Sequence, residues 1–515
     1  MERKRIAIVG SGISGLSALW SLRDSDHEVH LYEKDARLGG HTNTATWTYN
    51  GKSTPVDTGF IVMNTATYPN FIAFLKAINV KTMASSMTFG ISRDAGAFEW
   101  SGTSLGALFA QPFNALRPSF WRMIFDIVRF NLFSLDLLSS PVKPSSDLTI
   151  GQYLEKEGYS DAFRDDYLIP MTACVWSTGP DKCALEFPAL TLVRFMWNHH
   201  LLSTVAERPP WLTIEGGSQR YIDALMAQCN NAVVHMSTPV KALKRRNGKV
   251  ELSFDSTEGA AKTKIFDEVV LACHGDQART ILGTEATHDE KEVLSAFETS
   301  PNKAYLHSDL SLMPIRKEAW SSWNYITTSQ PPSAPTPDPT SGTLQNVCLT
   351  YNMNILQSLP TSAFGDILVT LNPPSPPSPA LTQASYEYRH PLYNARMVAA
   401  QEDLETIQGK RGIWYAGAWT GYGFHEDGFS SGMRVGLRLG GSVPWEAQDA
   451  KFIRGTAPTL AWADWVARTV VGVLQVFVGG FEEVVGVGRR RRSANAKVWE
   501  NGNGHGVANG KAKAA

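Results

Sequence analysis

The sequence predicts an α/β fold assembled from discontinuous segments, with an α+β domain interleaved between them. Strand-like and helix-like patterns alternate over residues 1–75 and return over 210–290 and 390–445, and a glycine-rich turn follows the first strand. Alternation of this kind is typical of a parallel sheet covered by helices. Residues 76–209 and 291–389 lack it, and they are expected to form the second domain.

The composition also favours two interleaved domains. The chain has 515 residues, of which 43% are apolar, and single cores seldom grow beyond about 250–300 residues. Its 48 basic and 49 acidic side chains leave a net charge of −1, so no global field would attract nucleic acid. The five cysteines form no CxxC pair and no set of closely spaced zinc ligands, which indicates a reduced protein without a bound metal.

Both ends of the chain bear on its location. The first strand begins at Ile6, which leaves no room for a signal peptide, so a cytoplasmic protein is expected. In the C-terminal extension, 446–515, the apolar stretch Thr469–Phe481 is shorter than the roughly 20 residues that span a bilayer. The following run Arg489–Arg492 leaves two interpretations open, a peripheral membrane segment with a basic anchor or a solvated end. From about Ser493 the composition predicts disorder.

The region between the first two α/β segments is rich in aromatic residues. Residues 105–138 carry them at helical spacing, which predicts a pair of helices packed into the core. An alternative is that these side chains line an apolar tunnel; they include Phe113, Phe120, Trp121, Phe125, Phe130 and Phe133. Two proline-rich stretches, 330–342 and 373–379, are expected to be extended surface loops.

A phosphate-binding turn directly follows the first strand. In such a βαβ unit the first glycine permits the tight turn, the second lets a pyrophosphate approach the backbone, and the third lets the helix pack on the strand. The phosphates then lie at the positive N-terminus of that helix. The order of strand, turn, helix and second strand predicts a Rossmann-type dinucleotide site made by Gly10, Ser11, Gly12, Ile13, Ser14 and Gly15.

The second strand, Val29–Glu33, ends on a carboxylate. At this position a carboxylate accepts hydrogen bonds from the ribose hydroxyls and repels a 2′-phosphate, so Glu33 disfavours NADP. The continuation through Lys34, Arg37, Gly39-Gly40 and His41 resembles the ExxxRxGG extension of flavoprotein oxidases and phytoene desaturases. The resemblance implies FAD, with these residues close to it. Many relatives have arginine where this chain has His41, so no fixed positive charge is expected there.

Further segments resemble the same group, in the same order along the chain. Val56-Asp57-Thr-Gly59 is similar to the acidic turn beside the flavin, and the strand followed by Thr238-Pro-Val240 is similar to the segment whose valine backbone meets adenine. The closing motif of flavin amine oxidases resembles the stretch that contains Gly417, Glu426 and Gly428. The familiar AGE is Ala416-Gly417-Ala418 here, so one usual carboxylate is missing, and Glu426 or Asp427 is a candidate to replace it.

The motifs also constrain the reaction. A single GxGxxG leaves no second nucleotide domain, so the organic substrate itself is expected to reduce the flavin by hydride transfer, with oxygen or another acceptor regenerating it. The absence of cysteine between Arg389 and Gly441 implies noncovalent FAD. Lys303 lies in a segment, Asn302–Asp309, that resembles the strand carrying the N5-proximal lysine of polyamine oxidases, and it is the catalytic candidate. The alternative acid–base groups are His199, His200, His274, His307 and His425.

Three functions are consistent with these patterns. The first is an oxidase or desaturase that removes hydride from a small apolar organic substrate such as a lipid, a polyketide or an amine. The second is a double-bond isomerase of unsaturated fatty acids, in which the hydride is returned to another carbon. The third is a non-enzymatic scaffold stabilised by FAD. The patterns do not separate them.

Overall fold

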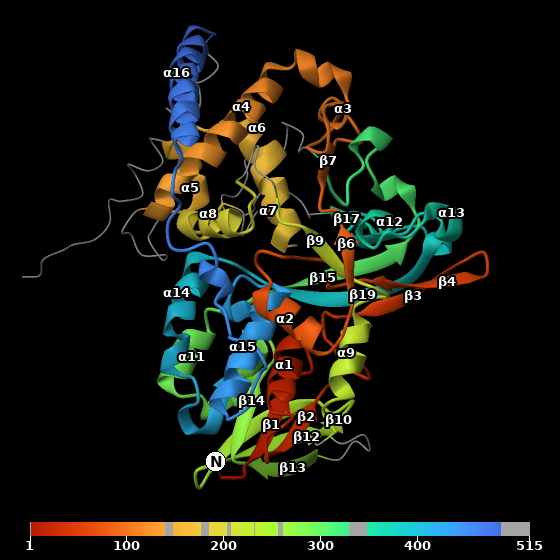
Figure 1. Cartoon of the computed structure of the whole chain (residues 1–515), viewed down its shortest axis with the longest axis vertical. Coiled ribbons are helices and arrows are strands. Elements are labelled where there is room, and N and C mark those ends of the chain that lie inside the picture. The colour runs from red at the N-terminus through yellow and green to blue at the C-terminus, as the bar shows by residue number, and fades with distance from the viewer. Residues whose placement is uncertain are drawn as a thin grey trace, which may run out of the picture.

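The molecule is built in three tiers along its long axis (Figure 1). The computed structural model describes residues 2–139, 148–176, 185–202, 208–230, 232–255, 261–328 and 348–485. A parallel sheet with its helices lies at the end that carries the N-terminus, a larger antiparallel sheet lies in the middle, and a layer of helices lies at the other end.

The N-terminal tier is centred on a five-stranded parallel sheet. Its strands come from the three segments whose alternating pattern predicted an α/β fold, so that fold class is confirmed. In spatial order the strands are β10 (Ala232–His235), β2 (Glu28–Tyr32), β1 (Arg5–Val9), β14 (Glu268–Leu271) and β20 (Ile413–Tyr415).

Alternate residues of β1 enter two different cores. Ile6 and Ile8 pack under helices α1 and α15, whereas Ala7 and Val9 face a three-stranded antiparallel sheet on the other side. This period of two is the pattern of a strand buried on both faces. The covering elements are α1 (Ile13–Ser21), α2 (Pro69–Ala77), α9 (Gln219–Met226), α10 (Gly275–Leu282), α11 (His288–Leu294), α14 (Ala395–Asp403), α15 (His425–Arg438), β11 (Val240–Arg246), β12 (Lys249–Asp255) and β13 (Ala261–Phe266).

Helices α1 and α15 approach each other closely because their interface carries glycine and serine. A Cβ at Gly432 would lie 1.8 Å from the carbonyl oxygen of Ser14, and one at Gly428 would lie 2.7 Å from Ile13. No side chain fits at such distances. The glycines of α15 therefore fix how deeply α1 is buried, and every residue of α1 is buried.

The middle tier is a seven-stranded sheet that joins distant parts of the chain. Its pairings are antiparallel except that of β7 with β16. The strands, in spatial order, are β19 (Thr382–Pro391), β15 (Thr299–His307), β18 (Leu368–Leu371), β17 (Cys348–Asn352), β16 (Trp323–Thr327), β7 (Phe89–Arg93) and β8 (Phe98–Ser101).

Several shorter elements lie beside the middle sheet (Figure 1). They are the hairpin β3 (Thr44–Tyr49) and β4 (Lys52–Asp57), the small sheet β5 (Met63–Asn64), β9 (Trp211–Ile214) and β6 (Thr82–Ser85), and the helices α12 (Met353–Leu356) and α13 (Thr361–Phe364). The proline-rich stretch 373–379 forms neither helix nor strand before Pro379, as predicted, whereas 330–342 lies outside the described residues.

The third tier consists of helices. They are α3 (Leu105–Leu108), α4 (Pro118–Phe133), α5 (Ile150–Lys156), α6 (Asp161–Phe163), α7 (Ile169–Trp176), α8 (Ala189–Asn198) and α16 (Trp462–Val485). The expectation of a core-packed helical pair over 105–138 is wrong in part. Phe120 and Phe130 are buried, but Phe113 and Trp121 are exposed. Within the described ranges, no helix is long and apolar enough to cross a membrane.

Candidate functional site

Four strands of the parallel sheet end at the same edge, and the segments that follow them meet there. Gly10 follows β1, Glu33 follows β2, Ala272 follows β14 and Gly417 follows β20. In open α/β sheets ligands bind in the crevice at the carboxyl ends of the strands. This edge also faces the seven-stranded sheet in the middle tier (Figure 1).

The turn after β1 needs glycine at two positions and leaves space at a third. Gly10 has φ +103°, and a Cβ there would lie 2.7 Å from the carbonyl oxygen of Ala272. A Cβ at Gly15 would lie 1.9 Å from the carbonyl oxygen of Gly10. In contrast, a Cβ at Gly12 would meet no described atom within 4 Å. The turn is thus closed on the side of the sheet and open beside Gly12.

The glycine pair crosses directly over this turn. Gly39 forms a bridge with Gly12, and its N–H donates to the carbonyl oxygen of Ser11 at 3.0 Å. Both Gly39 and Gly40 have positive φ, +109° and +58°. The Arg37 guanidinium donates to the carbonyl oxygens of Gly40 and Thr42 at 2.7 and 3.0 Å. In this structure Arg37 therefore holds the loop, and the contact with phosphate or ribose that the resemblance implied stays a prediction.

Glu33 lies beside the turn with a buried carboxylate. Its Oε2 accepts hydrogen bonds from the backbone N–H and the hydroxyl of Ser11, and its Oε1 accepts one from the backbone of Asp35. Its carbonyl oxygen accepts from the N–H of Thr238 at 2.7 Å, which brings the start of β11, at Val240, close to Glu33. Lys34 is exposed at the rim.

These residues fit the adenosine diphosphate part of a dinucleotide. Open space at Gly12 lies at the N-terminus of α1, whose first turn carries no acidic residue. Such a helix end attracts phosphate. Oε2 of Glu33 already accepts two hydrogen bonds, whereas Oε1 accepts one and keeps a lone pair for a ribose hydroxyl.

We call the turn 10–15, Glu33 and the glycine pair the dinucleotide cradle. Within two residues of the cradle the chain enters a polar cluster. Next to Gly40 and His41, Asn43 donates to the hydroxyls of Thr58 and Tyr388 at 2.9 and 3.0 Å. The Tyr388 and Thr58 hydroxyls are hydrogen-bonded at 2.8 Å. Because Tyr388 belongs to β19, this cluster ties the cradle to the seven-stranded sheet.

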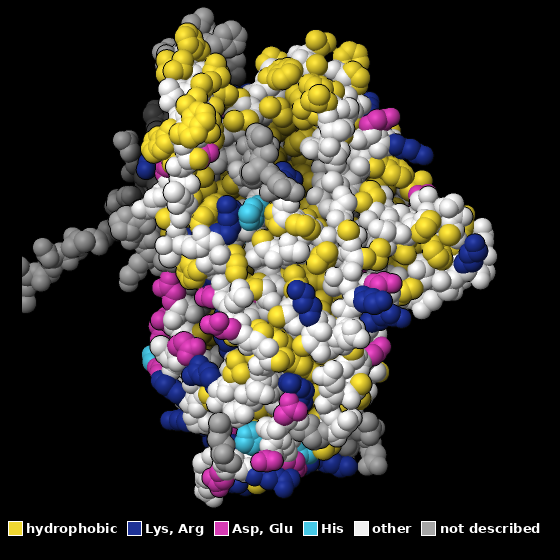
Figure 2. Space-filling model, in the orientation of Figure 1, with side chains coloured by type: hydrophobic (Ala, Val, Ile, Leu, Met, Phe, Trp, Pro, Cys, Tyr) yellow, Lys and Arg dark blue, Asp and Glu magenta, His cyan; other side chains and the backbone are white. Residues whose placement is uncertain are grey.

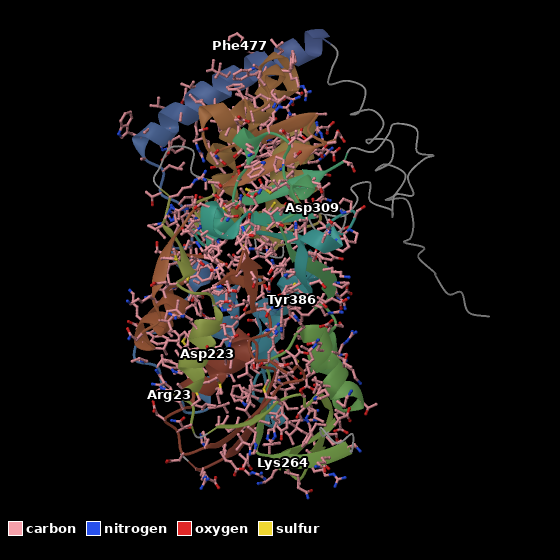
Figure 3. All side chains as sticks on the ribbon, turned by 90° about the vertical axis from the view of Figure 1, so that its right-hand side faces the viewer. Arg23, Asp223, Lys264, Asp309, Tyr386 and Phe477 are labelled. Carbon is pink, nitrogen blue, oxygen red and sulfur yellow. The ribbon has the colours of Figure 1, made fainter. Side chains whose placement is uncertain are left out.

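Imidazole rings surround the cluster. The ring centroid of His41 lies 5.2 Å from that of Tyr388, 5.8 Å from His274 and 5.3 Å from His390. The Nε2 atom of His41 is buried and has no hydrogen-bond partner among the described residues. Figure 3 shows Tyr386, two residues before Tyr388 on β19, at this level of the molecule.

Burial shifts the pKa values of several of these rings toward the neutral form. Burial lowers the pKa of His41 well below its usual range, and the neighbouring histidines His390, His274 and His425 lower it further. Burial lowers the pKa of His274 and brings that of His425 to about 3. Burial likewise raises the pKa of Tyr388. A buried imidazole nitrogen without a partner is costly unless a bound group satisfies it, so His41 is a candidate contact for a ligand.

Asp57 and Gly59 hold in place the segments that surround the site. The Asp57 carboxylate accepts from the backbone and hydroxyl of Ser218 and from the Thr44 hydroxyl, and burial raises its pKa to about 6. A Cβ at Gly59 would lie 2.1 Å from the carbonyl oxygen of His41. Asp57 thus fixes the turn at Gly217–Ser218, and Gly59 allows the chain to pass His41.

The closing motif is only partly what the resemblance implied. The N–H of Gly417 donates to the Ser431 hydroxyl at 2.9 Å, and Gly428 packs on α1. Glu426, considered as a replacement carboxylate for the cofactor, instead accepts from Asn70, Phe71 and Ser430 and so caps the start of α2. Three of these four donors bind its Oε1, and the N–H of Phe71 binds its Oε2. Asp427 accepts from the N–H of Phe424 at the start of α15.

Lys303 is not brought into the cluster. It is exposed on β15, and its ammonium lies 5.2 Å from the ring centroid of Tyr305. In the antiparallel pairing with β19, Asn302 is opposite Tyr388 and Lys303 is opposite Glu387. Paired residues share a face and successive residues alternate, so Lys303 lies on the other face from Tyr388. The structure therefore does not support a place for Lys303 beside the flavin N5.

Two histidines among the alternatives are hydrogen-bonded elsewhere in the fold. His307 is hydrogen-bonded to the Thr370 hydroxyl at 2.7 Å inside the middle sheet, and His199 is hydrogen-bonded to the carbonyl oxygen of Phe195 on α8. Sequence patterns missed Tyr388 and His390, which lie at the end of a long strand of ordinary composition. The spacing of two residues between them along β19, which places both on one face of a strand, was the available signal.

A family model described as flavin containing amine oxidoreductase matches residues 13–309, more than half of the chain. The chain belongs to this family. Membership confirms the predicted class, a flavin-dependent oxidoreductase, and implies a flavin cofactor. The matched range begins at Ile13, inside the glycine turn, and includes Glu33, the glycine pair and the polar residues Asn43 and Thr58.

Individual relatives have low sequence identity to this chain. A 15-cis-phytoene desaturase of Narcissus pseudonarcissus is 24% identical over 206 residues, which cover 38% of this chain and 35% of the desaturase. The match thus spans about a third of the length of the curated relatives. Among solved structures, a CLA-producing fatty acid isomerase from P. acnes has a TM-score of 0.56 at 15% identity, covering 85% of this chain and 99% of that chain. Cyclohexylamine oxidase from Brevibacterium oxydans IH-35A has 0.54 at 14% identity, covering 85% and 100%.

Proposed function

We propose that the protein is an FAD-dependent oxidase or desaturase that removes hydride from an apolar organic substrate. The observation that carries the proposal is the buried Nε2 of His41, which lacks a partner among the described residues. His41 directly follows the glycine pair over the phosphate-binding turn and contacts Tyr388 of the middle sheet. One short segment thereby links the dinucleotide cradle to a cluster able to contact a flavin ring or a substrate.

The residues of the cradle would divide the binding of FAD among them. The open side of Gly12 and the N-terminus of α1 suit the pyrophosphate. Glu33 suits the ribose hydroxyls, and its charge disfavours a 2′-phosphate. The backbone near Val240 suits adenine because Thr238 holds it against Glu33. When bound, FAD supplies the hydride acceptor, and the protein supplies orientation and exclusion of water.

We expect the FAD to be bound noncovalently. A cysteinyl link requires a thiolate. Burial raises the pKa of Cys229, Cys273 and Cys348 to about 12, and raises that of Cys174 well above its usual range. These four thiols are therefore protonated at neutral pH and are poor nucleophiles.

The neutral cluster favours an apolar substrate. Burial shifts the pKa values of His41, His274, His425 and Tyr388 in the direction of the neutral form, so these four side chains are uncharged at neutral pH. A charged carboxylate or ammonium would find no opposite charge on these four side chains and would lose its hydration. A lipid or polyketide chain would lose little. Oxygen or another acceptor would then regenerate the flavin.

Anaerobic reduction of the flavin tests this function. The purified yellow protein is incubated without oxygen with a panel of fatty acids, polyketides and amines, and the flavin absorbance is followed. We expect an apolar compound to bleach the flavin until air is admitted. Bleaching by amines alone would overturn the preference for apolar substrates.

Two other results of the same experiment would replace the proposal. A product that forms without lasting bleaching or oxygen uptake would indicate a double-bond isomerase, in which the hydride is returned to the substrate. A flavin that no compound in the panel reduces, on a protein that binds FAD fully, would favour a scaffold.

A further inference from the structure

Helix α16 turns its apolar face away from the protein. Eight of its large apolar side chains are exposed, among them Trp462 at 80%, Val476 at 74% and Phe477 at 70%. A helix on the surface of a water-soluble protein normally buries its apolar stripe and exposes the polar one. We call the eight residues the outer face of α16; they are Trp462, Trp465, Val466, Val470, Val473, Leu474, Val476 and Phe477.

The polar residues of α16 hold the opposite side of the helix against the body. Arg468 is buried, donates to the carbonyl oxygen of Leu132 at 2.5 Å and forms an ion pair with Asp136 at 2.8 Å. Gln475, two turns further along, lines a pocket together with Phe133 of α4 and Asp136. These contacts fix the rotation of the helix, so the outer face cannot turn inward without breaking the ion pair of the buried Arg468 with Asp136.

A second exposed apolar patch lies at the same end of the molecule. It consists of four side chains between the start of α3 and the first turn of α4, with exposures from 50% to 78%. Figure 2 shows both patches together at the end opposite β12 and β13. We call this second patch the α3–α4 apex; it contains Leu105, Phe113, Leu116 and Trp121.

Most of the exposed large apolar side chains among the described residues lie at this end of the molecule. The structure describes nineteen exposed large apolar side chains, and twelve of them belong to the outer face of α16 or to the α3–α4 apex. Contiguous patches of this kind mark a surface that is covered by a partner or a membrane. Figure 3 shows α16 running across this end, with Phe477 on its outer side.

We propose that this end of the molecule docks on the surface of an anionic lipid bilayer. The helix lacks the length of apolar sequence needed to span, and a large apolar face with tryptophan is typical of helices that lie in the membrane interface. The basic run Arg489–Arg492 begins four residues after Val485, the end of α16, within about 15 Å along an extended chain. It can therefore reach the headgroups beside the helix and be attracted to anionic lipid.

Neither the C-terminal residues of this chain nor a second copy of it is as well suited to cover both apolar patches. Residues 493–515 are mainly Gly, Asn, Ala and Lys, with Val498, Trp499 and Val507 as the larger apolar residues. Three scattered side chains cannot cover twelve. A second copy of the chain could cover α16 alone, but a flat bilayer surface meets both α16 and the α3–α4 apex at once.

Flotation with lipid vesicles tests the docking. The full chain, loaded with FAD, is mixed with vesicles of phosphatidylcholine containing about 30% phosphatidylserine. We expect the wild-type protein to float with the vesicles, and the combined variant Val470→Ser, Val473→Ser and Phe477→Ser to bind roughly tenfold or more weakly, because three apolar side chains no longer enter the interface.

A matched variant controls for the loss of three exposed apolar residues. Ile265→Ser, Ile315→Ser and Leu381→Ser change side chains that are 42% to 67% exposed outside both patches. This variant is expected to float like the wild-type protein. Flavin absorbance and the melting temperature should match in all three proteins, so the outcome does not depend on the chemistry proposed above.

Two further measurements distinguish a lipid bilayer from a second copy of the chain as the partner that covers α16. Replacing Arg489–Arg492 by glutamine should weaken binding roughly tenfold on anionic vesicles and scarcely on pure phosphatidylcholine. Equal flotation of wild-type protein and the α16 variant would overturn the proposal. So would a dimer in solution that the α16 variant converts to a monomer while neither protein floats, since a second copy would then cover the helix.

Discussion

The dinucleotide cradle and the neighbouring cluster around His41 depend on different features of their residues. The cradle depends on the absence of side chains: Gly10, Gly15 and Gly432 each lie where a Cβ would come within 3 Å of a backbone oxygen. The cluster depends on side chains, and its central members, His41 and Tyr388, come from segments separated by most of the chain. Backbone spacing is therefore rigidly fixed in the cradle, whereas in the cluster burial and neutral charge are what matter.

The largest expected effect concerns the closed side of the cradle. In Gly15→Ala the new methyl group would lie 1.9 Å from the carbonyl oxygen of Gly10, between β1 and α1. Overpacking of this kind against the backbone is expected to cost about 3 kcal/mol or more of the free energy of unfolding. Thermal unfolding of the apoprotein, followed by circular dichroism, measures it.

Gly12→Ala is the matched control for that change. Its Cβ would meet no described atom within 4 Å, and Gly12 has an ordinary φ of −61°. The melting temperature of this apoprotein should stay close to wild type. Equal melting temperatures for Gly12→Ala and Gly15→Ala would contradict the division of the turn into a closed and an open side.

A larger side chain on the open side should act on the cofactor and leave the fold intact. Gly12→Val projects into the space that the pyrophosphate would use, so FAD affinity is expected to fall by roughly a hundredfold or more. The purified variant should be nearly colourless while its circular dichroism matches the wild-type apoprotein. Wild-type flavin content in this variant would refute the position assigned to the pyrophosphate.

The comparison also explains which parts of the site a sequence can predict. The turn at 10–15 was predictable because its requirements are local: three glycines, a strand before and a helix after. The three segments that supply the five strands were predictable from repeated alternation of strand-like and helix-like patterns. The partnership of His41 with Tyr388 was not predictable, because it depends on how β19 lies against a loop more than 300 residues away.

Glu426 and α16 illustrate the limits of pattern matching. A carboxylate near a closing motif fitted a cofactor contact, but only the packing of α2 against α15 shows that Glu426 caps Asn70 and Phe71. The apolar stretch 469–481 left a peripheral membrane segment open, yet the sequence could not tell which face of a helix there meets the protein. That depends on Arg468 and its partner Asp136 in another part of the chain.

Burial of Glu426 predicts a dependence of stability on pH. Burial raises its pKa to about 7 in the folded protein, compared with 4.5 for the unperturbed group. The folded state therefore keeps the proton over a range in which the unfolded chain releases it, and stability falls as the pH rises from about 4.5 through 7. For this one group the loss between pH 5.5 and pH 7 is about 2 kcal/mol.

Comparing wild type with Glu426→Gln isolates that contribution. The glutamine does not titrate, so the variant should lose less stability over the same pH interval when chemical denaturation is measured. Some slope should remain, because burial raises the pKa of Asp57 to about 6 and that of Asp427 to about 7. An unchanged slope in the variant would show that the Glu426 carboxyl is already ionised at pH 5.5.

The smallest expected effect is that of Lys303→Met, and it contrasts the two faces of the middle sheet. The Lys303 side chain is exposed and opposite Glu387, on the face away from Tyr388. Its removal should change the rate of anaerobic flavin reduction by less than about twofold, since a positioned proton-transfer group would contribute roughly a hundredfold. FAD content should be unchanged.

Tyr388→Phe on the neighbouring strand is the control for Lys303→Met. It removes a hydroxyl that is hydrogen-bonded to Asn43 and Thr58, so two buried polar groups beside His41 lose a partner. Flavin reduction should slow by about tenfold, and the flavin spectrum should shift if the cluster touches the ring. A hundredfold loss in Lys303→Met with full FAD content would mean that the lysine does reach the reacting atoms. Because β15 cannot reverse its faces without a one-residue slip against β19, that result would require a different register for this pair of strands.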